Sequence, residues 1–277
     1  MQKSYDNSPS VYLIPTPIGN LEDITLRAIN TLKLVEVIFA EDTRVTIELL
    51  KHLGIEKKVI SNHEHNEVDN KEKLIMFLED NKNVGIVTDR GTPIISDPGY
   101  PLAKHAIESN YNVISLPGPT ALIPALTSSG LAPNPFTFIG FLNNKGSKIK
   151  SELNQYKSLN STLIFYESPK RLVNTLSVME SVLGNRQIAV SREISKKFES
   201  IYRGTITEVI KELPEAIKGE IVLVVEGNKE TQDYLSLTIL EHIKLYMEDG
   251  DDSKEAIKKV AKERNIPKSV VYMEYHK

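Results

Sequence analysis

The chain has 277 residues, 40% of them hydrophobic and 26% charged, with a formal net charge of −3. This length supports a sizeable core in one large domain or two ordinary ones. No apolar run approaches the ~20 residues of a membrane-spanning helix, and no apolar signal segment opens the chain, so we expect a cytoplasmic protein. The absence of cysteine excludes disulfides, thiol nucleophiles and thiolate metal sites. The net charge predicts no general attraction to nucleic acid, so any RNA contact must be local.

Strands and helices are predicted to alternate through a first domain at 11–130, after a disordered polar leader at 1–10. Short apolar runs bounded by turn residues predict strands at 11–14, 37–40, 59–61, 84–87 and 113–116. Periodic apolar residues between them predict helices. The first helix has Asp23 or Thr25 as its cap, and we expect its buried face to hold Leu26, Ile29, Leu32 and Leu34. Such alternation is typical of an α/β domain with an open, mainly parallel sheet.

Three of these strands end in stiff turns rich in proline and glycine. The turns span 15–20, 89–93 and 117–120, and another breaker cluster follows at 97–99. In open α/β sheets, ligands bind at the carboxyl ends of the strands. Gly91 lets a ligand approach the backbone closely, and Asp89 supplies a charged acceptor. Because no G-x-G-x-x-G or G-K-[ST] motif is present, the predicted ligand site is not of the kind that cradles a phosphate group.

Residues 63–67 combine histidines with carboxylates, the side chains that bind metal ions. His63 and His65 are only two residues apart, and no third ligand stands out in the sequence. A polar loop at the sheet edge is therefore favoured over a metal site, and we expect no bound metal.

A second α/β domain is predicted at 131–229, after a proline-rich linker at 131–135. Apolar runs predict strands at 136–141, 162–166, 188–190, 200–204 and 221–226, and helical patterns fall at 147–159, 169–183 and 207–213. Residues 193–202 resemble part of a hairpin, which predicts a mixed sheet.

The clearest basic patch of the chain lies between residues 145 and 171. Only Glu152 and Glu167 oppose its basic residues, which are Lys145, Lys148, Lys150, Lys157, Lys170 and Arg171. A contact with RNA and a solvated helix face are both compatible with this run.

A helical extension is predicted at 230–277. Ser253 is the expected cap of a helix with Ile257, Val260 and Ala261 facing inward. Asn265 takes the left-handed turn position before a second helix, as in a helix-turn-helix. Simple packing of two small helices is the alternative.

Six motifs in one order carry a resemblance to a known family. They are YLIPTPIGN at 12–20, AEDTR at 40–44, TDRGTPIISDPG at 88–99, PGP at 117–119, FYESPKR at 165–171 and SREIS at 191–195. Together they resemble the tetrapyrrole-methylase superfamily, from about residue 11 to residue 227. The resemblance implies two α/β domains of the class III methyltransferase type, with S-adenosylmethionine in the cleft between them, in a homodimer. It further implies methylation of a cytidine ribose 2′-hydroxyl in the decoding region of 16S rRNA, within the small ribosomal subunit.

The resemblance also implies which residues contact the cofactor. Carried onto this chain, they are Pro17, Ile18, Asp89, Gly91, Thr92, Pro93, Thr120, Ala121, Tyr166, Val190 and Gly219. One position departs, because the family usually has a small residue between Asp89 and Gly91, where this chain has Arg90. A cation beside a sulfonium is repulsive, so we expect Arg90 to point outward, toward RNA. The expected RNA contacts are Arg44, Arg90, Lys145, Lys148, Lys150, Lys170 and Arg171.

Methyl transfer from a sulfonium needs alignment of the two partners and removal of the hydroxyl proton, but no metal. Glu167 and Glu193 are the candidate bases, and structural ion pairs with Arg171 and Arg192 are the alternative for each. Two rival functions remain at this stage. One is methylation of a corrinoid or another non-RNA acceptor, and the other is a non-catalytic cofactor-binding or ribosome-docking module.

Overall fold

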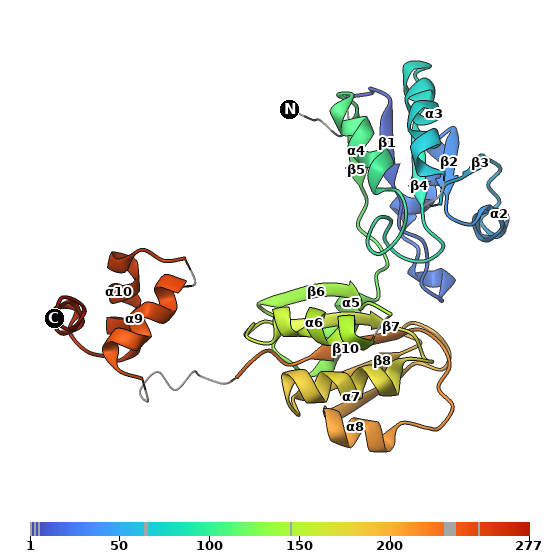
Figure 1. The fold of residues 1–277 in the computed structure, drawn as a ribbon. Coiled ribbons are helices and arrows are strands. Elements are labelled where there is room, and N and C mark those ends of the chain that lie inside the picture. Colours follow the sequence, from blue (N-terminus) through green and yellow to red (C-terminus); the bar gives the residue numbers. More distant parts are fainter. Residues whose placement is uncertain are drawn as a thin grey trace. The chain divides into compact units, whose positions relative to one another are not determined.

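The computed structural model describes residues 2, 4, 6–63, 66–144, 146–229, 237–248 and 250–277 (Figure 1). The chain forms two compact units, Met1–Gly227 and Asn228–Lys277. The first unit contains two five-stranded sheets, which define an N-terminal lobe and a C-terminal lobe. The second unit is helical. No helix in the described ranges combines the length and apolar character that crossing a membrane requires.

The N-terminal lobe is a parallel sheet in the order β3-β2-β4-β1-β5. The parallel arrangement confirms the prediction, which did not extend to the order of the strands. Its strands are β1 (Ser10–Leu13), β2 (Val37–Ala40), β3 (Lys58–Ser61), β4 (Val84–Val87) and β5 (Asn112–Ser115). Four helices cover the sheet: α1 (Leu26–Leu34), α2 (Thr43–His52), α3 (Glu67–Glu79) and α4 (Tyr100–Glu108). Side chains of α1 and α2 pack in one core cluster, and side chains of α3 and α4 pack in the other. Both β2 and β4 are buried along their whole length, as expected of central strands covered on both faces.

The predicted buried face of α1 was partly wrong. Thr25 does cap the helix, by accepting a hydrogen bond from the Ala28 N–H. However, Leu26 is 80% exposed and Leu34 is half exposed, whereas Ala28, Thr31 and Leu32 are buried. Residues spaced by three and four share one face of a helix, so burial of this small-residue stripe turns Leu26 and Leu34 toward solvent.

The C-terminal lobe is a mixed sheet, as predicted, and its strands lie in the order β6-β7-β10-β8-β9. Only β6 and β7 run parallel, and β8 and β9 form the expected antiparallel pair. The strands are β6 (Phe136–Phe141), β7 (Thr162–Glu167), β8 (Gln187–Arg192), β9 (Ser200–Thr205) and β10 (Ile221–Val225). One face packs against α6 (Gly146–Tyr156), α7 (Leu172–Leu183) and α8 (Ile206–Glu212).

The other face of this sheet packs against α5 (Leu122–Ser129). The sequence assigns this helix to the first domain, but its buried residues Ala125 and Leu126 pack in one cluster with Ala189 of β8 and Val222 of β10. The segment from the end of β5 into α5 therefore leads directly from one lobe to the other.

The second unit packs α9 (Ile239–Glu248), α10 (Ser253–Glu263) and α11 (Lys268–Tyr275) around a core of their own. Asn265 has φ 51°, which confirms the predicted left-handed turn. The cap of α10 is Asp252, one residue before the predicted Ser253, and it accepts from the Glu255 N–H. The predicted inward residues of α10 are buried, and Ala256 is buried with them.

Candidate functional site

The three proline- and glycine-rich turns meet because their strands β4, β1 and β5 are neighbours in the sheet. Thr16 and Gly91 exchange two backbone hydrogen bonds, of 2.9 and 3.0 Å. The Thr92 hydroxyl donates to the Pro119 carbonyl at 3.0 Å. Gly91 has φ +85°, and a Cβ atom there would lie 3.3 Å from the Ile18 side chain. The turns are thus bonded into one rim that leaves little room for a side chain at position 91.

A cavity of about 340 Å³ lies between this rim and the C-terminal lobe. Its volume and its largely apolar wall fit a small-molecule site. The N-terminal lobe and the start of α5 contribute Ile18, Arg90, Gly91, Thr92, Ile95, Ser96, Asp97, Thr120 and Ala121. The C-terminal lobe contributes Phe141, Tyr166, Glu167, Ser168, Pro169, Ile194, Gly219, Glu220, Ile221 and Val222.

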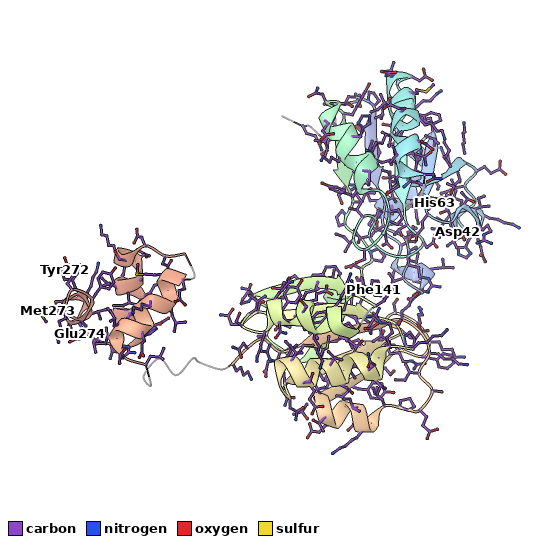
Figure 2. The ribbon with its side chains drawn as sticks, in the orientation of Figure 1. Asp42, His63, Phe141, Tyr272, Met273 and Glu274 are labelled. Atoms are coloured by element: carbon purple, nitrogen blue, oxygen red, sulfur yellow. The ribbon has the colours of Figure 1, made fainter. Side chains whose placement is uncertain are left out.

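An aromatic group forms part of the cavity wall. The Tyr166 ring meets Phe138 and Phe141 edge-on, with ring centroids 5.0 and 5.6 Å apart. Phe141 comes from the end of β6 and is 56% exposed (Figure 2). Burial raises the pKa of Tyr166 above its usual value, against the opposing effect of a hydrogen bond with Thr120. Tyr166 is therefore a neutral surface on which a flat ring can stack.

The residues predicted to bind the cofactor divide into two groups. Seven line the cavity: Ile18, Gly91, Thr92, Thr120, Ala121, Tyr166 and Gly219. Pro17 and Pro93 do not line it, and they belong to the turns that shape the rim.

The Asp89 side chain also lies outside the cavity wall. Its carboxylate accepts a hydrogen bond from the Asp42 N–H at 2.9 Å and so joins the ends of β4 and β2. Burial raises the pKa of this carboxyl, and the negative charges of Glu41 and Asp42 act in the same direction.

Val190 points to the opposite side of the sheet. Its side chain is buried in the core under α7 and α8, because neighbouring residues of a strand alternate between faces. Ser191 pairs with the cavity residue Val222 in the sheet, and opposed residues share a face. The Ser191 hydroxyl is buried and has no hydrogen-bond partner among the described atoms. The prediction therefore placed the side chain one residue away from the cavity face.

Glu167, a predicted base, is held on both of its carboxylate oxygens. One oxygen accepts from the Ser168 N–H at 2.7 Å and lies 3.4 Å from Arg171 Nε. The other accepts from the Thr175 hydroxyl at 2.6 Å. The side chain is 1% exposed. Arg171 in turn donates to the carbonyls of Leu142 and Asn143, so this carboxylate anchors a loop as part of an ion pair.

Glu193, the second predicted base, belongs to a charged network at the edge of the cavity. Lys196 donates to Glu193 at 2.8 Å and to Glu220 at 2.9 Å. Burial acts to raise the pKa of Glu193, but hydrogen bonds from Lys196 and the Glu220 N–H leave it below its usual value. A Cβ atom at Gly219 would overlap the Glu193 carboxylate at 2.4 Å. Glu193 is thus an ionised, paired group.

Arg90 completes this network from the other lobe. Its guanidinium donates to Glu220, and both side chains are about half exposed. Arg90 also lines the cavity. The side chain therefore lies at the rim, where Glu220 compensates its positive charge.

Asp97 is the site residue that the sequence-based prediction missed. It lines the cavity, and its carboxyl is within hydrogen-bonding reach of the buried Thr88 hydroxyl. Burial, and next the negative charge of Glu41, raise the pKa of Asp97 to about 7. The loop that carries it is conformationally unusual, since Ile94 and Ser96 have φ of 78° and 66°. Such backbone conformations concentrate at functional sites.

The predicted RNA-contacting residues are mostly surface groups outside the cavity wall. Lys148, Lys150 and Lys170 are exposed, and Lys145 lies outside the described residues. Arg44 is 88% exposed on α2 and pairs with Asp42 at 2.6 Å. Arg171 has the structural role described above.

The segment considered for a metal site is only partly described, because Glu64 and His65 lie outside the described residues. His63 follows β3 (Figure 2), and its backbone N–H donates to Asn66. Within the described ranges, no group of three histidine, aspartate or glutamate side chains is suited to hold a metal ion.

The fold and the cavity define a two-lobed α/β protein with a candidate small-molecule site at the carboxyl edge of its parallel sheet. Solved methyltransferase structures share this fold. The methyltransferase CobJ has a TM-score of 0.59 at 18% identity, over 79% of this chain and 95% of that one. Diphthine synthase has a TM-score of 0.61 at 11% identity, over 79% of this chain and 90% of that one.

The sequence comparisons identify the family. The profile of the Tetrapyrrole (Corrin/Porphyrin) Methylases matches residues 10–210. The chain is 49% identical to ribosomal RNA small subunit methyltransferase I of Bacillus subtilis (strain 168), over 96% of this chain and 94% of that protein. It is 45% identical to the protein of the same name from Halalkalibacterium halodurans, over 99% and 98%. The chain belongs to the tetrapyrrole methylases and is a methyltransferase.

Proposed function

We propose that this protein uses S-adenosylmethionine to methylate a cytidine 2′-hydroxyl in the decoding region of 16S rRNA. The observation that carries the proposal is the near full-length similarity to proteins named ribosomal RNA small subunit methyltransferase I. The interlobe cavity is the proposed methyl-transfer site. The partner is the small ribosomal subunit, and the cytoplasm is the corresponding location.

The cavity residues fit S-adenosylmethionine. A volume of about 340 Å³ is within the usual range for small ligands. Tyr166 and Phe141 offer surfaces for an adenine ring, and Gly91 permits close approach to the backbone. Asp97 brings negative charge to a cavity that would receive a sulfonium. The residues proposed to hold the cofactor are Ile18, Gly91, Thr92, Thr120, Ala121, Tyr166 and Gly219.

When bound, S-adenosylmethionine supplies an activated methyl group with a good leaving group. The protein then has to align the acceptor oxygen, exclude water and remove one proton. The bonded turns of the N-terminal lobe provide a stiff surface for alignment, since Thr16, Gly91, Thr92 and Pro119 hold one another in place. The apolar side chains around them exclude water from the reacting groups.

Arg90→Ala should change S-adenosylmethionine affinity by less than about threefold, or ~0.7 kcal/mol. Glu220 compensates the guanidinium charge at the rim, and a half-exposed pair contributes little. Calorimetric titration of the wild type and the variant measures the change. Arg44→Ala is the matched control, because it removes an exposed, paired arginine that does not line the cavity. A tenfold gain in affinity for Arg90→Ala would show instead that Arg90 obstructs the cavity.

The exposed lysines of α6 are the proposed contacts with the RNA backbone. Lys148→Glu combined with Lys150→Glu should weaken binding to 30S subunits and reduce its salt dependence, because fewer counterions are released. The slope of the logarithm of the binding constant against the logarithm of the salt concentration should become less steep by about 0.7–0.9 for each phosphate contact that is lost. Filter binding over a series of salt concentrations measures both quantities. Lys82→Glu with Lys104→Glu supplies the same charge change on the N-terminal lobe. Equal effects of the two pairs would remove α6 from the RNA-binding face.

The decisive experiment is incubation with labelled S-adenosylmethionine and separate acceptors. We expect the label on a cytidine ribose of 16S rRNA when 30S subunits are supplied. Transfer to a corrinoid instead would support the rival acceptor, and binding without transfer would support a non-catalytic module. The homodimer that the family resemblance implies is checked by light scattering of the purified protein.

A further inference from the structure

The carboxylates that line the cavity are Asp97, Glu167 and Glu220, and Glu193 lies at its edge. All of these four but Asp97 are already engaged. Glu167 accepts hydrogen bonds on both oxygens, and Glu220 pairs with Arg90 and Lys196. Glu193 is paired with Lys196 and is not part of the wall. A carboxylate held by a cation is a weak proton acceptor, since the cation favours its ionised form. Asp97 is the fourth.

Asp97 has different surroundings. The charged groups that face it are the carboxylates Glu41 and Asp89, with the Tyr166 phenol across the cavity. Arg90, Glu167 and Glu220 line the same cavity and are paired with one another or with other partners. Asp97 is therefore a cavity-facing carboxyl in a negative, partly dehydrated environment.

The Thr88 hydroxyl beside Asp97 can pair with either protonation state of that carboxyl, although its hydrogen bond to the ionised form opposes the rise in the pKa of Asp97. The Thr88 oxygen lies 2.9 Å from Glu41 Oε2 and is within reach of Asp97. A hydroxyl has one hydrogen and two lone pairs. When Thr88 donates to Glu41, its lone pair can accept a hydrogen bond from protonated Asp97. Thr88 thus accommodates both protonation states of its neighbour.

On the basis of the proposed function, we propose that Asp97 is the proton acceptor for the ribose hydroxyl. The proton leaves the ribose 2′-oxygen for a carboxylate oxygen of Asp97, while a lone pair of the 2′-oxygen forms the new bond to the methyl carbon. The carbon–sulfur bond breaks and its electron pair stays on sulfur. The products are a methyl ether, a neutral thioether and a neutral Asp97, which later releases the proton to water. The raised pKa of Asp97 agrees with this role, because a proton acceptor works best with a pKa near the working pH.

The first test is single-turnover methylation of 30S subunits at saturating S-adenosylmethionine, over a range of pH. Asp97→Asn should lower the rate by about 10²–10⁴-fold and abolish the rise of rate with pH. Asp80→Asn makes the same charge change on an exposed residue at the end of α3, and it should keep the wild-type rate and profile. A wild-type rate and pH profile in Asp97→Asn at saturating cofactor would overturn the assignment. No label on rRNA with the wild type would instead contradict the proposed function.

The second test needs no cofactor or RNA. A carboxyl whose pKa is raised by folding destabilises the folded state once it ionises. The cost begins above the unfolded value near 3.8 and is complete once the pH exceeds about 7. The melting temperature of Asp97→Asn relative to wild type should therefore rise between pH 4 and 7 and then stay constant. A pH-independent difference would show that Asp97 lacks the required environment.

Asp97→Glu covers the case in which the asparagine variant does not fold. It retains a titratable carboxyl but moves it by one methylene group. We expect a reduced rate that still rises with pH, with a displaced midpoint. A rate that does not depend on pH in Asp97→Glu would overturn the proposal.

Discussion

Replacing Glu167 with alanine should lower the free energy of unfolding by about 3–5 kcal/mol, because it leaves Arg171 without its buried counter-ion. The fully buried Thr175 hydroxyl would lose its acceptor as well. Arg171 also holds the carbonyls of Leu142 and Asn143, so the loop after β6 should loosen with it. Urea denaturation followed by circular dichroism measures the loss.

Glu108→Ala is the matched control for this substitution. It removes a glutamate from an exposed pair with Lys104, 3.7 Å apart, which should cost less than about 0.5 kcal/mol. If Glu167→Ala were as stable as Glu108→Ala, the buried pair would be unimportant for folding, and the predicted role of Glu167 as a base would regain support.

Gly227→Ala should also lower the free energy of unfolding, by up to about 3 kcal/mol. A Cβ atom there would lie 2.2 Å from the Asn160 carbonyl oxygen and 2.6 Å from that of Ser161. These are backbone atoms, so the clash cannot be relieved by turning a side chain. Either the end of β10 or the loop before β7 must move. Thermal and urea denaturation of the purified variant measure the cost.

Gly130→Ala separates steric clash from backbone strain. Gly130 has φ +81°, but a Cβ atom there would meet nothing within 4 Å. The free energy of unfolding of this variant should fall by only ~1–2 kcal/mol, which is the cost of placing a residue with a side chain in the left-handed region. If Gly227→Ala lowered the free energy of unfolding no more than Gly130→Ala does, the backbone at Asn160 would be able to move at little cost.

The fold was predictable because the apolar runs are short and sharply bounded. β2, β4 and β6 begin and end at the predicted residues, since turn residues flank fully or partly buried strands. The buried face of α1 was less predictable. The prediction gave weight to the leucines at positions 26 and 34, whereas the buried face of the helix holds Leu32 with the smaller Ala28 and Thr31.

The sequence predicted where the candidate site lies, but it did not predict the role of each residue in the site. Proline and glycine marked the three turns, and strand order then brought them together. The state of a charged group depends on its neighbours in space, so the sequence did not show that Glu167 is fully bonded. Asp97 was treated as one member of a turn-forming cluster. Asp97 is distinguished as a site residue by its raised pKa, which results from burial and from the charge of Glu41, 56 positions earlier in the chain.

The order of strands has a consequence for synthesis of the protein. The parallel sheet has all its strands by Ser115, so it can close while the rest of the chain is still being translated. The mixed sheet cannot, because β10 is made last and lies in the middle, between β7 and β8. Until Val225 has emerged, those two strands lack their shared neighbour, and their apolar edges stay open. The part of the cavity wall that the C-terminal lobe contributes is therefore completed only after β10 has been translated.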